Sequence, residues 1–446
     1  MVDEMPTPSE PANQSGRSFL RWLAIDLTPL RASRDYRWLF AGQFVSSFGS
    51  AISYVVMPWQ MYQLTRSSFA VGMLGVVEVV PMLLMAFVGG ALADTIDRRR
   101  LIVLAELGLT LCCAILVLNS LLARPRAWVL LLIAALFAAL SAIHRPALEA
   151  LTPRLVDPKQ LPAVSALSSL RYNFNFIIGP AIAGIIAASL GAAAAFTIDA
   201  ATYFVSIITL LLIRSVPVPV DAERASLRSV IEGLKYARSR QELLGTYLID
   251  LNAMFFGMPM ALFPALAESF GGASVGLFYT MPAVGSLAVT LTSGWTNRVN
   301  KHGLAVTIAA MVWGLAIIGF GLAGRLWLAL LFLALAGAAD MVSGLFRMTI
   351  WNQTIPDHLR GRLASIEMIS YSTGPYLGNA EAGLVASLFG LRTSVVSGGV
   401  LCVVGSGLLA LLLPAFIRYE GREGLARKQA EEAERARAAS QRRGTS

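Results

Sequence analysis

Charged side chains are scarce in this chain of 446 residues. Asp, Glu, Lys and Arg make up 14% of it, against about 25% in ordinary soluble domains, whereas 56% of the residues are hydrophobic. The mean hydropathy is +0.64. A soluble core does not need so many apolar residues, so the composition excludes an ordinary water-soluble domain and indicates a polytopic membrane protein.

Cysteine and histidine are equally rare, with three of each. Cys112 and Cys113 are adjacent and Cys402 is remote from them, so no CxxC or zinc-type spacing exists. We interpret all three as small packing residues. No GxxxxGK[ST] phosphate loop occurs, which argues against ATP hydrolysis. We therefore expect neither an enzyme nor a resident metal ion or cofactor.

An apolar centre is missing from residues 1–16, so we expect no cleavable signal peptide. Long hydrophobic segments are abundant further along, each about 20 residues in length, which is what an α-helix needs to cross a bilayer. The prediction is an all-α integral membrane protein with twelve transmembrane helices in two pseudo-symmetric six-helix bundles. The segments lie near 37–58, 71–92, 101–122, 127–144, 164–189, 192–213, 242–266, 273–295, 304–323, 326–346, 364–389 and 393–416.

Basic residues are distributed unevenly between the loops. If the N-terminus is cytoplasmic, most of the 36 Lys and Arg residues fall in cytoplasmic segments. The positive-inside rule then predicts a multi-pass protein of the cell (inner) membrane with both termini in the cytoplasm. The net charge of +9 requires no nucleic acid, since these residues border an anionic leaflet. The opposite loops hold only Arg66, Arg124, Arg126, Arg325 and Arg392.

The longest internal hydrophilic stretch separates two groups of six apolar segments. Gly179 and Gly184 recur as Gly378 and Gly383 at a constant displacement, which indicates two parallel repeats. The polar tail is expected to be a solvated or surface helix, or else a docking segment for a partner. The predicted organisation is a cytoplasmic N-terminal segment (1–36), an N-terminal bundle (37–213), a cytoplasmic loop (214–241), a C-terminal bundle (242–417) and a cytoplasmic charged tail (418–446).

A short charged run, Gly-Gly-Ala-Leu-Ala-Asp-Thr-Ile-Asp-Arg-Arg-Arg, joins the second and third apolar segments at 89–100. It is too short to be a domain and too charged to contact lipid. Asp94 falls at the C-terminal end of a predicted helix, where the helix dipole disfavours a carboxylate, so it should find a partner elsewhere. The alternative is a basic loop that only sets the orientation. The corresponding run in the second half carries Asn297 and Asn300 instead of the acids.

This run resembles the loop signature of the major facilitator superfamily. The match covers Gly90, Leu92, Asp94 and the basic cluster, and departs at Thr95 and Asp97. In that superfamily the equivalent acid docks against helix eleven and closes the cytoplasmic side, so the resemblance implies a conformational switch. The residues assigned to this switch or gate are Gly90, Asp94, Asp97, Arg98, Arg145 and Arg362.

A second motif, Gly179-Pro180-Ala-Ile-Ala183-Gly184, lies in the fifth segment. Pro180 removes a backbone hydrogen bond and the glycines allow close helix contact, which predicts a bending and packing point. It resembles the antiporter motif of the same superfamily, with Ala183 where glycine is usual. Other stretches resemble the siderophore-exporter branch related to the enterobactin exporter, and this implies export of a siderophore. They are 144–147, 152–156, 262–268, 276–279, 292–294, 354–356 and 361–362.

Ionisable residues inside membrane spans are costly and therefore functional candidates. The histidines His144, His302 and His358 are expected at the ends of spans, so proton coupling is assigned to carboxylates. Burial favours the protonated form of such a group. Each acid has an alternative role as a paired packing residue, and Asp340 is expected to pair with Arg347 on the same helix face. The candidates for proton coupling are Glu78, Asp199 and Asp250.

Polar residues recur at helical spacing in two segments and predict the wall of a cavity. Gln43, Ser47 and Tyr54 lie at helical spacing on the first segment, as do Arg171 and Asn175 on the fifth. Arg171 either contacts an anionic or catecholate-like cargo or neutralises a buried acid. The other cavity candidates are Met254 and Met258, for which lipid or core packing is the alternative, and Glu381.

Together these features predict a secondary transporter that works by alternating access. The leading hypothesis is proton-coupled export of a siderophore or another amphipathic small molecule. The alternatives are a multidrug efflux antiporter, lysophospholipid transport or uptake, and a non-transporting membrane sensor or scaffold. The expected partners are a small-molecule substrate, the proton gradient and the lipid bilayer, with no nucleic acid, and the protein is expected to be a monomer.

Overall fold

The computed structural model describes the backbone of residues 26–95, 97–214, 235–272, 274–356, 359–422, 424–431 and 433. Side chains are described over the same ranges except for 86–95, 297, 360–362 and 364–372. Every extended regular element in these ranges is a helix, as predicted. Ten described segments are long and apolar enough to cross a membrane. A shorter apolar helix, α12 (Val275–Leu291), and α15 (Arg360–Phe389) occupy the two remaining predicted positions.

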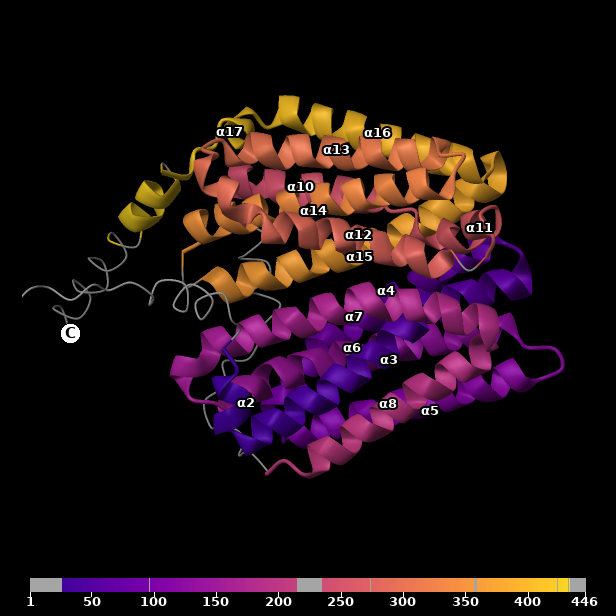
Figure 1. The fold of residues 1–446 in the computed structure, drawn as a ribbon. Coiled ribbons are helices and arrows are strands. Elements are labelled where there is room, and N and C mark those ends of the chain that lie inside the picture. The colour runs from indigo at the N-terminus through magenta and orange to yellow at the C-terminus, as the bar shows by residue number, and fades with distance from the viewer. Residues whose placement is uncertain are drawn as a thin grey trace, which may run out of the picture.

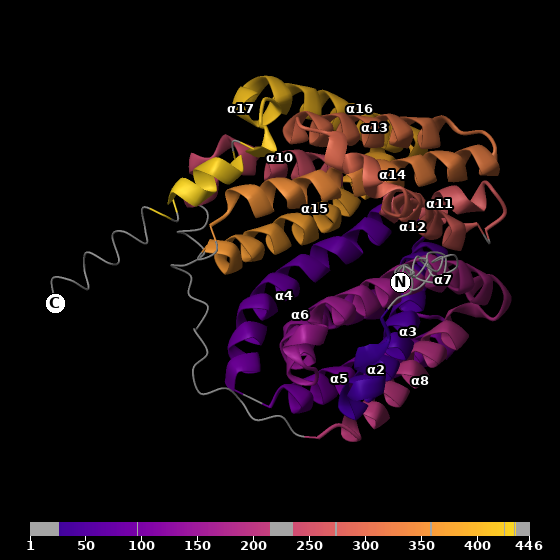
Figure 2. The same cartoon turned by 60° about the vertical axis from the view of Figure 1, so that its left-hand side comes forward.

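The N-terminal helices lie together on one side of the molecule, and the C-terminal helices lie on the other (Figures 1 and 2). The first group comprises α2 (Thr28–Ala32), α3 (Arg34–Thr65), α4 (Ser68–Thr95), α5 (Arg98–Leu121), α6 (Ala127–Leu151), α7 (Leu161–Ser189) and α8 (Gly191–Leu211). The short 3-10 turns η1 (Thr152–Arg154) and η2 (Pro158–Gln160) join α6 to α7.

The second group begins after the interdomain segment. It comprises α10 (Gln241–Phe256), α11 (Phe263–Glu268), α12 (Val275–Leu291), α13 (His302–Leu322), α14 (Leu326–Thr354), α15 (Arg360–Phe389), α16 (Leu391–Leu412) and α17 (Pro414–Ile417). Two 3-10 turns, η3 (Met260–Leu262) and η4 (Ser293–Arg298), lie before α11 and after α12. Long helices alternate in direction in both groups. The end of the molecule that carries α2 and α17 is called the terminal end. The opposite end, near α11, is called the far end (Figure 1).

Helix limits follow the predicted apolar segments closely, with four differences. Three helices continue beyond the predicted ends at 58, 144 and 346, to Thr65, Leu151 and Thr354. Membrane helices tolerate internal proline because neighbouring groups satisfy the freed carbonyl, and α3 and α6 accordingly run through Pro58 and Pro146. The fourth difference is that α10 stops at Phe256, before Gly257 and Pro259, rather than continuing to 266.

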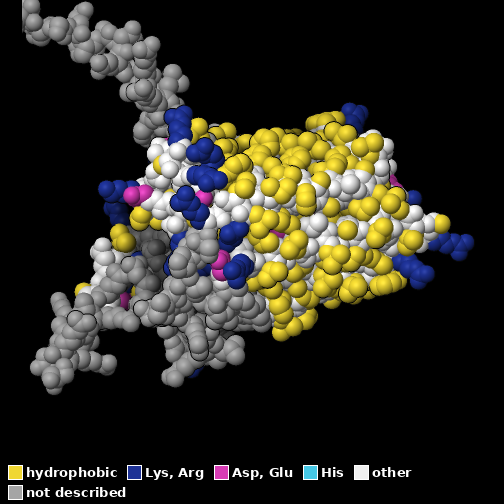
Figure 3. All heavy atoms as spheres, turned by 90° about the horizontal axis from the view of Figure 1, so that it is seen from below, with side chains coloured by type: hydrophobic (Ala, Val, Ile, Leu, Met, Phe, Trp, Pro, Cys, Tyr) yellow, Lys and Arg dark blue, Asp and Glu magenta, His cyan; other side chains and the backbone are white. Residues whose placement is uncertain are grey.

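The outer surface is apolar over most of the length of the helices. Leu104, Leu111 and Leu118 repeat along one face of α5 and are 60%, 62% and 66% exposed. A continuous apolar surface of this kind is stable only against lipid. Figure 3 shows a broad hydrophobic band, with Lys and Arg gathered mainly beside the terminal end. The protein is therefore a multi-pass membrane protein.

Described contacts between the two groups lie toward the far end, where α4 packs on α15 and α7 packs on α12. Glycine makes this packing close. A Cβ at Gly72 would lie 2.5 Å from the carbonyl oxygen of Asn379, and one at Gly383 would lie 2.5 Å from that of Ser68. The helices therefore meet backbone to backbone, which a larger side chain would prevent. We call these contacts the far-end seam.

Two further interactions close the far-end seam. Thr280 on α12 donates a hydrogen bond of 3.0 Å to the carbonyl oxygen of Ile177 on α7. Arg66, at the end of α3, forms an ion pair with Glu268 at the end of α11, and Gln63 donates to the same carboxylate at 3.2 Å. Both interactions join the N-terminal helices to the C-terminal helices.

Candidate functional site

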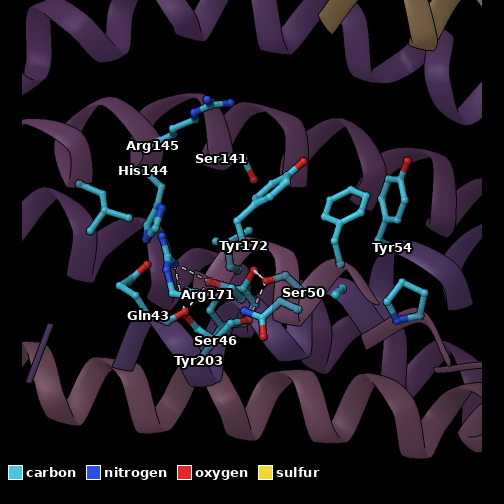
Figure 4. A pocket seen from close by; sticks show the side chains of 17 residues that line it. Gln43, Ser46, Ser50, Tyr54, Ser141, His144, Arg145, Arg171, Tyr172 and Tyr203 are labelled. Carbon is cyan, nitrogen blue, oxygen red and sulfur yellow. Dashed lines mark hydrogen bonds between the residues drawn. The ribbon is translucent and has the colours of Figure 1, made fainter. Parts of the chain in front are cut away.

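A cavity of about 420 Å³ lies within the N-terminal group, between α3, α5, α6, α7 and α8 (Figure 4). Its wall combines polar, cationic and aromatic side chains. The lining residues are Gln43, Ser46, Ser47, Ser50, Ala51, Tyr54, Leu109, Ser141, His144, Arg145, Leu148, Arg171, Tyr172, Asn175, Phe176, Pro180 and Tyr203.

The polar stripes expected from the sequence both face this cavity. Gln43, Ser47 and Tyr54 line it from α3, and Arg171 and Asn175 line it from α7. Five of the eight cavity candidates are thereby brought together, because residues spaced by three or four positions share one face of a helix. Their role in binding remains a prediction.

Arg171 projects into the polar end of the cavity. Its guanidinium donates to the hydroxyl of Ser47 at 2.7 Å and to the carbonyl oxygen of Gln43 at 3.3 Å. Among the described residues it has no carboxylate partner, so the alternative role of neutralising an adjacent acid finds no support there. A partly buried charge held only by neutral groups is costly, which favours an anion as its partner.

An aromatic wall forms the other end of the cavity. The rings of Tyr172 and Phe176 stack with centroids 4.9 Å apart. Tyr54 lies against Phe176 at 6.4 Å and, across the far-end seam, against Tyr279 at 5.7 Å. The cavity therefore offers a cation at one end and flat apolar surfaces at the other, as the labelled side chains of Figure 4 show.

Sequence reasoning missed a pair of residues beside the cavity, Glu106 and His144. His144 Nε2 lies 3.2 Å from Oε1 of Glu106, and the histidine lines the cavity. One assumption concealed the pair, because the fourth span was predicted to end at 144. Because α6 continues to Leu151, His144 lies about two helical turns inside the bundle.

The three proton-coupling candidates lie in different surroundings. Asp199 on α8 is fully buried and accepts hydrogen bonds from Ser53, from Thr202 at 3.4 Å and from the Cys113 thiol at 3.5 Å. These contacts tie α3, α5 and α8 together. Asp199 is absent from the cavity wall, and its position is that of a packing acid.

Asp250 on α10 forms an ion pair with Arg347 on α14. Arg347 also lies 3.8 Å from Asp340, so the pairing expected between these two residues is present, although it is the longer of the two contacts. Asp250 and Asp340 face one another across a small gap beside Trp313 and do not reach the main cavity.

Glu78 on α4 is half-buried and makes no hydrogen bond or ion pair with any described residue. It is near enough to the hydroxyls of Tyr54 and Tyr376 to interact with them electrostatically. Tyr54 belongs to the N-terminal group and Tyr376 to the C-terminal group. Glu78 therefore lies where the two groups meet, next to the aromatic end of the cavity.

The gate residues are only partly described, since the side chains of Gly90, Asp94 and Arg362 lie outside the described residues. Asp97 caps α5, because its carboxylate accepts from the backbone N–H groups of Arg99 and Arg100. The switch contact of Asp94 therefore stays a prediction.

Two arginines of the same run donate hydrogen bonds to the ends of neighbouring helices. Arg98 donates to the carbonyl oxygen of Ala150 on α6 at 3.0 Å. Arg99 donates to the last turn of α8, at 2.8 Å to Leu210 and 2.9 Å to Leu211. Arg145 lines the cavity and pairs with Glu149 at 3.0 Å, one turn along α6.

The predicted bending motif lies at two close helix contacts. A Cβ at Gly179 would lie 2.5 Å from the Cβ of Ala51 on α3. On the opposite side, Gly276 of α12 lies directly against Pro180 and Gly184. The motif therefore contributes to the far-end seam as well as to the cavity, which is consistent with the predicted packing role.

The remaining cavity candidates lie away from the cavity. Met254 is buried in the core and packs on Gly374 of α15, and Met258 packs partly buried against the same core. Glu381 is half-buried near the far end of α15. None of the three is among the residues that line the cavity, so for both methionines the core-packing alternative describes the observed position.

Two groups of long helices that pack on each other, with a polar cavity inside the N-terminal group, are the arrangement of a transporter of the major facilitator superfamily. The family model described as transmembrane secretion effector matches residues 24–445, and the chain belongs to that family. Its relatives are named as transporters, so the protein is a membrane transporter and not an enzyme.

Curated relatives and solved structures agree with this assignment. The chain is 28% identical to the enterobactin exporter EntS of Citrobacter koseri over 401 residues, 89% of this chain and 96% of that protein. It is 28% identical to the same exporter of Shigella boydii over 395 residues, 88% and 95% of the two chains. The fold is similar to a bacterial homolog of the human lysosomal transporter Spinster in an inward-facing, unoccupied conformation, with TM-score 0.69, 16% identity and coverage of 92% and 100%. The nucleoside transporter NupG superposes with TM-score 0.66 at 12% identity, with coverage of 87% and 100%.

Proposed function

We propose that this transporter exports a siderophore, or a similar amphipathic anion, from the cytoplasm in exchange for protons. The relatives that carry the name enterobactin exporter support this cargo class. The excess of basic residues at the terminal end supports an inner-membrane orientation with both termini in the cytoplasm.

Arg171 is the observation that carries the proposal. Among the described residues, the guanidinium is bonded only to a hydroxyl and a carbonyl oxygen, and in the wall of a 420 Å³ cavity it is suited to an anionic group. The stacked rings of Tyr172 and Phe176 are suited to the planar part of the same molecule. A catecholate-type siderophore carries both features.

Alternating access would proceed by exchange of the far-end seam for a closure at the terminal end. In the orientation proposed here, the seam closes the outer side and the cavity loads from the cytoplasm. Asp94 is proposed to hold the terminal end closed in the opposite state, against α15. Glu78 is the proposed carrier of the coupling proton, since it lies between the two helical groups without a fixed partner.

The test is enterobactin transport into inside-out proteoliposomes with an imposed proton gradient. Arg171→Gln should reduce uptake about tenfold or more, because a charge-assisted hydrogen bond contributes about 1.5–3 kcal/mol. Arg171→Lys keeps the charge and should retain part of the activity. Arg325→Gln, on an exposed loop at the far end, is the matched control and should transport normally. Equal transport by Arg171→Gln and the control would contradict the proposal.

Multidrug efflux is the second candidate, favoured by the aromatic wall, which can stack on many planar rings. The same vesicles distinguish the two functions. An exporter selective for anions should not transport the planar cation ethidium, whereas a multidrug exporter should transport it with or without the Arg171→Gln substitution. Robust ethidium transport by the wild-type protein, without enterobactin transport, would establish multidrug efflux instead.

A further inference from the structure

Asn175 on α7 carries a polar atom that no described residue satisfies. Its side-chain nitrogen donates to the main-chain carbonyl oxygen of Phe44 on α3, at 3.3 Å. Because a carbonyl can only accept, this contact also fixes which end of the amide is the oxygen. That oxygen, Oδ1, is buried and has no hydrogen-bond partner among the described residues. An acceptor buried without a donor is unfavourable, so the position favours a molecule that brings a donor to it.

Two serine hydroxyls on α3 line the same cavity but do not supply this donor. Ser47 donates its hydrogen to the carbonyl oxygen of Gln43, and Ser50 donates at 2.9 Å to that of Ser46. A hydroxyl has a single hydrogen, so both groups can otherwise only accept. Ser47 accordingly accepts from Arg171 at 2.7 Å. These serines therefore leave the oxygen of the asparagine to a molecule in the cavity.

Asn175 lines the cavity although only 3% of the residue is exposed. Its hydrogen bond to Phe44, at 3.3 Å, is longer than most bonds of this type and is correspondingly weak. The terminal torsion of an asparagine side chain is also soft. A modest rotation of the amide can therefore bring Oδ1 to the cavity face while α7 stays in place.

Four residues within two turns of α7 offer three kinds of contact to the cavity. Arg171 supplies a cation and Asn175 an acceptor, whereas Tyr172 and Phe176 supply stacked rings. Arg171 and Asn175 are four positions apart, which places them on one face of the helix with about 6 Å between them along its axis. This separation is comparable to the width of a substituted aromatic ring. A ring with an anionic group on one side and a donor on the other would meet all three contacts.

We infer that Asn175 is a specificity-determining residue of the cavity and selects aromatic anions that carry a free hydroxyl group. The anionic group binds Arg171, the ring lies on Tyr172 and Phe176, and the hydroxyl donates to Oδ1 of Asn175. An analogue whose hydroxyl is absent or methylated leaves that oxygen unpaired and binds less tightly. The inference rests on the proposed function for the cavity as the cargo site. It narrows the cargo from amphipathic anions in general to hydroxylated aromatic ones.

Equilibrium binding of three small aromatic acids to the purified protein in nanodiscs tests the inference. The probes are 3-hydroxybenzoate, benzoate and 3-methoxybenzoate, which share the carboxylate and the ring and differ in the donor. The wild-type protein should bind 3-hydroxybenzoate about fivefold more tightly than either of the others, the usual net effect of one hydrogen bond. Asn175→Leu removes the acceptor at similar volume and should bind all three without this preference. Asn175→Ala is the second variant and should give the same result if leucine impairs folding.

Asn252→Ala is the matched control. Asn252 on α10 also donates to a main-chain carbonyl oxygen of a neighbouring helix, that of Cys402 at 2.9 Å. It is absent from the described lining of the cavity. The substitution therefore removes an equivalent bond between helices without touching the proposed contact, and the variant should keep the wild-type preference for 3-hydroxybenzoate.

Equal affinity of the wild-type protein for the three acids would overturn the inference and leave the proposed function intact. A preference that survives both substitutions of Asn175, or that is lost equally in Asn252→Ala, would do the same. A preference that depends on Asn175, in a protein that does not transport enterobactin, would overturn the proposed function alone. Failure to bind any of the three acids would contradict the cavity as the cargo site and therefore both.

Discussion

Glu78, Asp199 and Asp250 are chemically similar acids whose surroundings separate their roles. Asp199 has three side-chain donors, Asp250 has a guanidinium, and Glu78 has neither among the described residues. A proton carrier must alternate between charged and neutral forms, and fixed donors oppose that change. At the residue scale, the absence of a fixed partner among the described residues therefore favours Glu78 as the proposed carrier over the other two acids.

Glu78→Gln should abolish gradient-driven transport while counterflow exchange of the cargo survives, because the amide mimics the protonated acid and cannot release a proton. Asp199→Asn should instead lower thermal stability by an amount typical of a broken buried network, about 1–3 kcal/mol. Glu381 is a half-buried acid near the far end of α15, so Glu381→Gln is the control and should retain both activities. Gradient-driven transport by Glu78→Gln at the wild-type rate would show that the proton binds elsewhere.

Part of the cavity wall could be predicted, because helical spacing shows which residues share one face of a helix but not which residues of different helices meet. Gln43, Ser47 and Arg171 were found from the sequence because residues on one helix face follow from helical spacing alone. The contact of Glu106 with His144 joins two helices, and no spacing within one helix encodes it. The predicted end of the fourth span at His144 added a further error, because the polar run His-Arg-Pro suggested a loop where the helix continues.

At the scale of elements, glycines and caps set how the helices end and meet. The twelve helices were predictable because each presents an apolar run of membrane length. Which helices pack together was harder to predict. The pairing of α4 with α15 and of α7 with α12 depends on glycines that allow close contact, and the sequence does not show which backbone lies opposite each glycine. Asp97 is observed as the N-cap of α5, which the sequence analysis did not predict, and its gate role stays a prediction.

Gly276→Leu should prevent closure of the far-end seam, because any side chain there meets Pro180 and Gly184. We expect a population shift toward the state that is open at the far end. The measurement is labelling of a cysteine at Thr280 by a maleimide added from that side, and the labelling rate should increase. Gly294→Leu, where a Cβ meets nothing within 4 Å, is the control and should leave the rate unchanged. An unchanged rate in Gly276→Leu would contradict the role of the seam.

Asp97→Ala should lower the unfolding free energy by about 1 kcal/mol, the usual contribution of an N-cap side chain. Asp97→Asn should be close to neutral, since asparagine caps as well as aspartate. Thermal unfolding of both variants in the same detergent measures the difference. If Asp97→Asn folds normally yet loses transport, the negative charge serves the switch and capping is only part of its role.

At the scale of the whole molecule, the two helical groups are held together by unequal interactions. Backbone contacts of the seam are extensive, whereas the Arg66–Glu268 pair lies on the surface, with side chains 60% and 39% exposed. Exposed ion pairs contribute little, up to about 1 kcal/mol. The ion pair can therefore adjust the balance between conformations without determining it.

Arg66→Glu should accordingly shift the conformational equilibrium by no more than about fivefold toward opening at the far end, since repulsion replaces a weak attraction. The double variant Arg66→Glu with Glu268→Arg should restore the original balance. Labelling at Thr280 measures both. A complete loss of transport in the single variant, not recovered in the double variant, would show that Arg66 has a second role.

One consequence of the seam concerns how such a transporter changes over evolution. The contacts of the seam are made largely by main-chain atoms and glycines, where a Cβ would meet the opposite backbone, whereas most side chains that line the cavity take no part in them. Under the proposed mechanism, variation in the cavity would alter the accepted compound without disturbing the seam. On that proposal, a few replacements in one half of the chain would be enough for a single architecture to acquire a new cargo.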